Sequence, residues 1–89
     1  MTRSSIFYRL EKSIGGGCVS VFEFHTVVNG NMYIAEHEEF DNGQLGWIGS
    51  KEMTNKDSGN KKYLQLKAQG YKFAGRYEMD ICGHKEKLK

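Results

Sequence analysis

Two strand-like segments joined by an Asn-Gly pair constrain the fold of this 89-residue chain most strongly. Residues 18–28 are rich in Val, Phe and Thr, and residues 32–40 follow across a short polar connection that contains Asn29 and Gly30. Asn-Gly suits a two-residue type I′ turn, because both central positions of that turn need positive φ angles. We therefore expect an antiparallel hairpin here.

Alternation of apolar and polar side chains predicts one further strand before this hairpin and one after it. Residues 5–12 and residues 71–81 both alternate in this way, as a strand with one buried face does. Glycines 15–17 would end the first strand. The expected buried side of the second strand comprises Tyr71, Phe73, Tyr77, Met79 and Ile81.

Residues 60–69 fit both a helical stripe and a strand. Gly70, followed by apolar Tyr71 within reach of Leu66, matches the Schellman ending of a helix. Residues 57–60 offer candidates for the N-cap. We therefore favour a helix over a β-hairpin that turns at Gln69 and Gly70.

Three other segments are expected to lack regular structure. Residues 41–50 carry Gly43, Gly46 and Gly49 around Trp47, which predicts a loop whose tryptophan plugs the core. Residues 51–60 are polar and predict a mobile segment that is either a solvated loop or a weak, frayed first turn. Residues 83–89 are expected to form a frayed tail beyond an ordered core of residues 5–82.

These elements give the order β-β-β-α-β in one domain that spans residues 1–89. Short connections favour antiparallel pairing, with the helix packed on one face of the sheet. We predict a small α+β fold with about four strands, and an all-β small barrel is the alternative. The chain supplies enough large apolar side chains for one core and not for two.

Composition argues for a cytoplasmic protein without a membrane segment. The first residues turn polar too soon for a secretory signal, and no apolar run approaches about 20 residues. Cys18 and Cys82 fall far below the density of a disulfide scaffold, so both are expected to stay as thiols. No motif indicates a cofactor or a metal.

The charge of the chain is divided by position, although the net charge is only +2. Residues 51–89 hold nine Lys and Arg76 against five acidic residues. Residues 13–50 contain no Lys or Arg, and their acidic residues are Glu23, Glu36, Glu38, Glu39 and Asp41. If the fold keeps these segments apart, the surface is strongly polarised, which favours binding to a charged partner.

Pairing across Asn29 and Gly30 would place residues opposite one another when their numbers sum to 59. Glu23 then faces Glu36, and His25 and Glu38 share their face of the hairpin. Opposed carboxylates repel, so this register implies a compensating cation. It could be Arg9, Lys12 or Arg76 of a neighbouring strand, or a basic patch on another macromolecule. The third alternative is that the cluster forms a metal site or an acid/base site.

The basic segment suggests a nucleic-acid surface as an alternative. Lysines supply contacts to phosphates, and interleaved aromatic residues can stack on bases. The candidate binding residues are Lys61, Lys62, Lys67, Lys72 and Arg76.

We expect a non-catalytic domain that binds a larger protein, as an inhibitor or adaptor of the kind that phages and mobile elements carry. The expected protein-binding residues are Glu23, Glu36, Glu38 and Glu39. The alternatives are the nucleic-acid binder and a small enzyme or metal site built from Glu23, His25, Glu36 and Glu38. An exposed hairpin edge could also pair with a second copy of the chain to form a homodimer.

Overall fold

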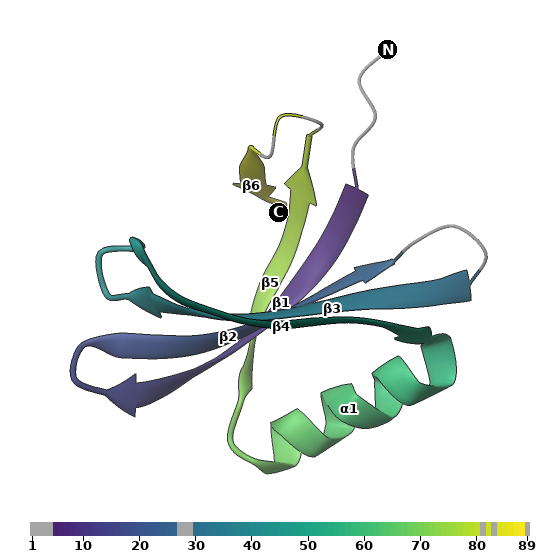
Figure 1. Cartoon of the computed structure of the whole chain (residues 1–89), viewed down its shortest axis with the longest axis horizontal. Helices are drawn as coiled ribbons and strands as arrows, with labels where there is room; N and C mark the ends of the chain where they lie inside the picture. Colours follow the sequence, from purple (N-terminus) through teal and green to yellow (C-terminus); the bar gives the residue numbers. More distant parts are fainter. Residues whose placement is uncertain (1–4, 27–29, 81, 83, 89) are drawn as a thin grey trace.

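A computed structural model describes residues 5–26, 30–80, 82 and 84–88 (Figure 1). The strands form one antiparallel six-stranded sheet in the order β4-β3-β2-β1-β5-β6. The elements are β1 (Ser5–Gly15), β2 (Cys18–Thr26), β3 (Asn31–Phe40), β4 (Leu45–Asn55), α1 (Lys56–Ala68), β5 (Lys72–Met79) and β6 (Lys85–Lys87). The α+β class is confirmed in this coarse form. The strand count was predicted too low, and the structure shows a single sheet instead of the alternative barrel.

Both additional strands lie where irregular structure was predicted. β4 occupies most of the two expected loops and pairs with β3 from Asn55 opposite Asn31 to Leu45 opposite Glu39. The predicted frayed tail contains β6, which pairs with the end of β5. The placement of Trp47 in the core was also wrong, because Trp47 lies on β4 with 52% of its surface exposed. These strands are defined by pairing with a neighbour and not by a buried face.

The helix was predicted correctly in type and in its ending, but it begins earlier. Asn55 is the N-cap, and its side chain accepts a hydrogen bond from the Ser58 backbone N–H. At the C-terminus the Tyr71 N–H donates to the Leu66 carbonyl at 3.0 Å, while Gly70 adopts a φ of +100°. These features form the predicted Schellman ending. Within the part of the chain that the structure describes, no helix is long and apolar enough to span a membrane.

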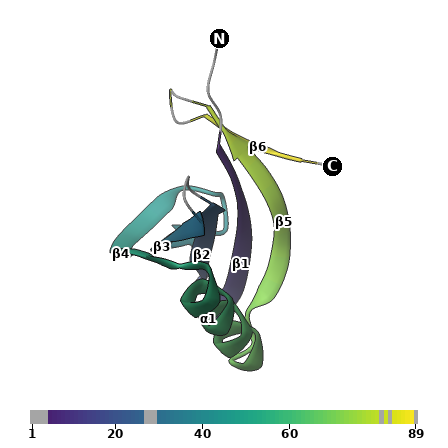
Figure 2. The same ribbon diagram turned by 90° about the vertical axis from the view of Figure 1, so that its right-hand side faces the viewer.

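Helix α1 packs on one side of the sheet, which we call the helix face; the other side is the open face (Figures 1 and 2). Tyr8, Tyr63 and Tyr71 surround the core that lies between α1 and the sheet. This core comprises Leu10, Phe22, Phe24, Met32, Ile34 and Leu66. Burial of these side chains supplies the main force that holds α1 on the sheet.

A β-bulge in β5 divides the aromatic row that was predicted to share one face. Leu10 pairs with Phe73 and Arg9 pairs with Gly75, so Ala74 is an extra residue. Gly75 has a φ of +118°, a conformation that favours glycine. As a result, Tyr71 packs against Phe22 on the helix face, whereas Tyr77 stacks on Phe7 on the open face. Ile81, the last member of the predicted row, lies outside the described residues.

The β2–β3 hairpin is confirmed, but its register differs by one residue from the predicted one. Glu23 lies opposite Ala35, and the last pair is Thr26 with Met32. The predicted type I′ turn includes residues 27–29, which lie outside the described residues. A shift by one residue moves side chains to the other face of a strand. Glu36 therefore pairs with Phe22 on the helix face, and it is His37 and Glu39 of β3 that share the open face with Glu23.

Candidate functional site

The open face contains a hollow of about 540 Å³, which we call the trough. Most of its lining comes from β2, β3 and β4, and Met79 and Lys85 close it from the other side. Its floor is polar and is formed by Glu23, His25, His37 and Glu39. Its rim includes Tyr33, Leu45, Ile48 and Met79.

A curved sheet gives the trough its depth. In the strand order, β1 and β5 separate β6 from β2, yet Lys85 of β6 reaches Glu23 of β2 at 2.8 Å. The Lys85 ammonium also lies 5.6 Å from the ring centroid of Phe7, which is buried on the open face between these strands. Figure 2 shows the bend of β1 and β5 that accompanies this contact. The sheet thus curls far enough for the Lys85 side chain to line the trough.

Glu23 is an almost completely buried carboxylate with two hydrogen-bond partners. It is 4% exposed, and its oxygens accept hydrogen bonds from His25 Nε2 at 3.1 Å and from Lys85 Nζ at 2.8 Å. Burial raises the pKa of this carboxyl, but the hydrogen bonds from His25 and Lys85 and the charge of Lys85 outweigh it and lower the pKa to about 2. Glu23 is therefore ionised at neutral pH.

A second charge cluster lies on the same face. Arg9 binds Glu39 through two hydrogen bonds of 2.7 and 3.0 Å, and His37 Nε2 lies 2.6 Å from the same carboxylate. Burial raises the pKa of Glu39, yet the hydrogen bonds from Arg9 and His37 lower it overall. Arg9 also contacts Glu11 at 3.1 Å. Both floor carboxylates of the trough are thus held by side chains of the domain itself.

The predicted compensating cation is present in part. Arg9 was one of three candidates, although it neutralises Glu39 and not a pair formed by Glu23 and Glu36. Lys12 instead donates to the Gln69 carbonyl at the end of α1. Arg76 is exposed on β5 opposite Tyr8, which belongs to the helix-face packing. Lys85 was missed, because nothing in the local pattern of residues 83–89 indicated that one lysine reaches a buried carboxylate.

We predict that acid destabilises the domain through Glu23. The pKa of Glu23 is lowered from 4.5 to about 2 by folding, so its contribution to stability is present above about pH 4.5 and is lost as the pH falls toward 2. Urea unfolding at pH 7, 4.5 and 3 should show a loss of roughly 2 kcal/mol by pH 3, out of roughly 3 kcal/mol over the whole acid range. In Glu23→Gln the acid-dependent loss should shrink markedly. Parallel pH curves for the two proteins would contradict this assignment.

The predicted enzyme or metal cluster does not assemble as proposed. Glu36 lines the trough, and its carboxylate accepts a hydrogen bond from Ser50 Oγ at 3.3 Å. Glu38 lies opposite Ser20 of β2, and this pair is on the helix face, as Phe22 is. The observed register thus places Glu38 away from Glu23 and His25, whereas Glu36 lines the same trough as they do. Among the described residues, no group of three or more His, Cys, Asp or Glu is arranged to hold a metal ion.

The candidate nucleic-acid residues lie on α1 and β5, and most of them are exposed. Lys62 donates to Glu52 at 3.0 Å and lies near the Phe22 ring. Of the aromatic residues interleaved with them, Tyr63 and Tyr71 pack against the core, and Phe73 is half exposed. The remaining candidates are exposed on α1 and β5, namely Lys61, Lys67, Lys72 and Arg76.

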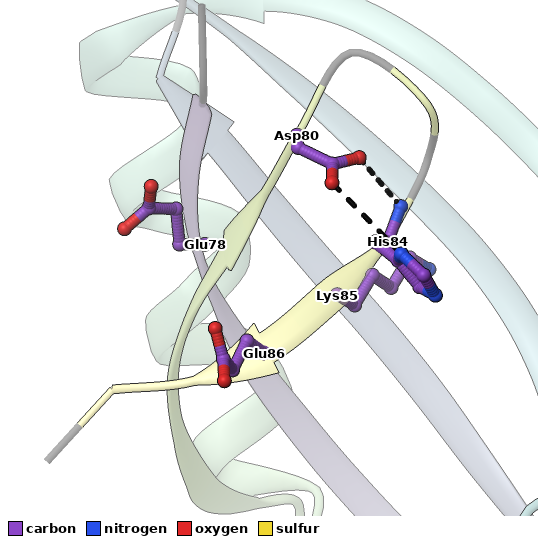
Figure 3. Close-up of a pocket in the computed structure, with 5 residues that line it drawn as sticks. All are labelled: Glu78, Asp80, His84, Lys85 and Glu86. Carbon is purple, nitrogen blue, oxygen red and sulfur yellow. Dashed lines mark hydrogen bonds and ion pairs between the residues drawn. The ribbon is translucent and has the colours of Figure 1, made fainter. Parts of the chain in front are cut away.

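A smaller hollow of about 320 Å³ lies at the β5–β6 hairpin (Figure 3). Asp80 Oδ1 accepts hydrogen bonds of 2.9 Å from the backbone N–H groups of Cys82 and His84, so this carboxylate fixes the turn. The His84 ring is exposed and lies 3.9 Å from Asp80 Oδ2. Glu78, Lys85 and Glu86 complete the lining. The arrangement stabilises a connection between strands.

Fold and site together define a single-sheet α+β domain with a charged, apolar-rimmed trough on the face opposite its helix. Comparison with protein-family models, with curated proteins and with solved structures finds no match for this chain.

Proposed function

We propose that this chain is a non-catalytic protein-interaction domain whose partner docks on the trough and on the adjoining strand β4. Large apolar side chains left in water beside the trough carry this proposal. Leu45 and Ile48 of the rim are 52% and 59% exposed, and Met53, which pairs with the trough residue Tyr33, is 61% exposed. Apolar side chains gathered around a concave surface mark interaction sites in small domains. An inhibitor or adaptor of a larger protein would use such a surface.

The charges of the trough support binding over acid/base catalysis. A general acid or base works best with a pKa near the working pH. The pKa of Glu23 is about 2, and the pKa of Glu39 is also lowered, so both carboxylates remain ionised and hydrogen bonded near neutral pH. Fixed, internally paired charges would instead orient a partner and select against the wrong ones.

The trough includes three of the four residues expected to bind protein. Glu23, Glu36 and Glu39 line it, whereas Glu38 lies on the helix face of β3. The proposed surface also contains apolar residues of β4 that the sequence analysis assigned to loops. Their contribution to binding is therefore the sharper test.

We predict that Leu45→Ser abolishes binding of the partner, whereas Leu64→Ser leaves this binding unchanged. Leu64 is 66% exposed on α1, away from the trough, so the two variants make the same change at two exposed leucines. Loss of one exposed apolar side chain that becomes buried in the interface weakens binding by about 10-fold or more. Affinity capture from nuclease-treated native lysate, with wild type and both variants in parallel, measures this effect.

The wild type and Leu64→Ser should retain the same protein in equal amount, and Leu45→Ser should lose most of it. Equal retention by all three proteins would exclude the trough as the docking site. If the wild type captures partner proteins from untreated lysate but none from nuclease-treated lysate, the proposal is overturned in favour of the nucleic-acid alternative. That alternative also predicts binding that weakens steeply as salt is added.

A further inference from the structure

We infer that Lys85 fills, within the domain, the place of a lysine side chain of the partner, and that β6 is a strap that the partner displaces when it binds. This inference rests on the proposed function and adds to it the chemistry of the partner and a means of control. Three features support it, namely the source of the cation that pairs with Glu23, the contacts of β6 with the open face, and a repulsive pair that weakens the attachment of β6.

The cation that pairs with Glu23 does not come from a neighbouring strand. Glu23 lies directly opposite Arg9 of β1. The Arg9 guanidinium is bound to Glu39 and Glu11 instead. Within the described part of the chain, the lysine or arginine that pairs with Glu23 is Lys85, 62 residues further along the sequence. A carboxylate that is 4% exposed therefore depends on a three-residue strand for its cation.

Two lysines connect β6 with the open face. The Lys85 ammonium lies 2.8 Å from Glu23 and 5.6 Å from the ring centroid of Phe7. The Lys87 side chain lies against the bulge glycine Gly75, where a Cβ would be 2.7 Å from Lys87 Cε. All three residues of β6 are nonetheless exposed, and the Lys85 side chain is 43% exposed. β6 is thus a strap that its side chains hold in place without being embedded in a core.

A repulsive pair weakens the attachment of β6 to the sheet. Glu78 of β5 lies directly opposite Glu86 of β6 (Figure 3). Like charges in opposite positions destabilise the pairing of two strands. β6 pairs with β5 over three residues and, among the described strands, has no neighbour on its other side. The position of the strap therefore depends strongly on the contact between Lys85 and Glu23.

A partner that fills the trough meets Lys85, because this side chain lines it. If the partner displaces Lys85, Glu23 needs another cation, because a buried carboxylate without one is strongly destabilising. Docking on the trough excludes water, so the partner itself must supply the replacement. The vacated place offers a carboxylate and the face of the Phe7 ring, and both attract an ammonium group. A lysine of the partner matches this place as Lys85 does.

Two variants should shift the strap in opposite directions, and amide hydrogen exchange of Leu88 measures this shift. The Leu88 N–H donates to the Arg76 carbonyl of β5 at 2.8 Å, so its exchange reports the opening of the strap. Lys85→Gln removes the contact with the trough and should speed this exchange by at least about 10-fold. Glu86→Lys replaces a like-charge pair with an opposite-charge pair and should slow it by about 3-fold.

Asp57→Lys is the matched control, since it makes the same change in charge as Glu86→Lys on the exposed start of α1. It should leave the exchange of Leu88 unchanged. Amides in the middle of β2 report global unfolding, so a change confined to Leu88 identifies movement of the strap. Unaltered Leu88 exchange in both Lys85→Gln and Glu86→Lys would overturn the inference.

The replacement of Lys85 by a separate ammonium group is tested with n-butylammonium, which resembles the end of a lysine side chain. In Lys85→Ala, n-butylammonium chloride should raise the midpoint of thermal unfolding by about 2 °C or more relative to sodium chloride at equal concentration. The effect should be absent in Lys85→Ala/Glu23→Gln, which lacks the carboxylate. Equal midpoints of Lys85→Ala in the two salts would exclude a lysine of the partner at this place.

Affinity capture from nuclease-treated lysate connects the strap with the proposed function. At limiting amounts of lysate, Glu86→Lys should retain about 3-fold less partner protein than the wild type, because its strap is harder to displace, whereas Asp57→Lys should retain the same amount. Equal retention by Glu86→Lys and the wild type would overturn the role of the strap in binding.

Failure of the inference and failure of the proposed function give different results. If the exchange and n-butylammonium results are as expected while Leu45→Ser still captures the partner, the strap and its ammonium site stand and the proposed docking surface is wrong. If those results fail while Leu45→Ser abolishes capture, the inference is wrong and the proposed function stands.

Discussion

Arg9→Met is expected to lower the free energy of unfolding by about 3 kcal/mol at neutral pH, because it leaves Glu39 partly buried without its principal cation. Arg9 and Glu39 are largely buried side chains joined by two hydrogen bonds, a geometry far stronger than that of an ordinary surface ion pair. Urea unfolding followed by circular dichroism measures the effect.

The control for this prediction is Arg76→Met, the same change at an exposed arginine on the neighbouring strand, which should cost less than about 1 kcal/mol. The double variant Arg9→Met/Glu39→Met should recover a substantial part of the loss, because removing both charges leaves neither of them unpaired. A cost for Arg9→Met as small as that of Arg76→Met would show that this pair contributes little to stability.

Phe24→Ala is expected to have a still larger effect and to unfold much of the protein. Phe24 is fully buried on β2, stacks on Tyr8 at 5.3 Å and meets the edge of Tyr63 of α1 at 5.7 Å. Truncation removes contacts to the sheet and to the helix together, at a cost of about 3–5 kcal/mol. This approaches the whole stability of many domains of this size, so the thermal transition should fall by more than about 15 °C.

Phe73→Ala provides the matched control, because Phe73 is 49% exposed on β5. It should cost less than about 1 kcal/mol in the same thermal unfolding experiment. Comparable losses for the two variants would mean that the packing of α1 on β2 does not dominate the stability of the domain.

The hairpin and the ending of the helix could be predicted because each depends on local sequence. The pair Gly70 and Tyr71 indicates a Schellman ending, and the structure confirms its hydrogen bonds. The register of the hairpin could not be predicted in the same way. Residues 20–25 of β2 are all buried, so no alternation between a wet and a dry face fixes the pairing.

Strand β4 escaped prediction because its apolar residues stay exposed and its glycines resemble loop signals. The strand exists through its pairing with β3, which local propensity does not report. The bulge in β5 did leave a signal. A glycine inside an alternating pattern, here Gly75, suggests a bulge, and it would have divided the predicted aromatic row.

Only part of the candidate site could be predicted, because some of its contacts depend on how the strands pair and curl. Glu23, Glu36 and Glu39 were named from their charge, with Glu23 and Glu36 also paired by a register that is wrong by one residue, and all three line the trough. The role of His37 and the reach of Lys85 depend on the register and on the curl of the sheet, and both are tertiary properties.

The position of β1 between β2 and β5 has a consequence for how the chain folds. Strands β1 to β4 form a meander of neighbouring hairpins, whereas the pairing of β1 with β5 joins Ser5 to Met79 across most of the chain. Contacts between residues far apart in sequence slow folding, because the chain loses loop entropy before they form. We therefore expect the meander to assemble first and the closing of β5 onto β1 to limit the folding rate. A partner that binds β4 could then engage the chain before the opposite half of the sheet is complete.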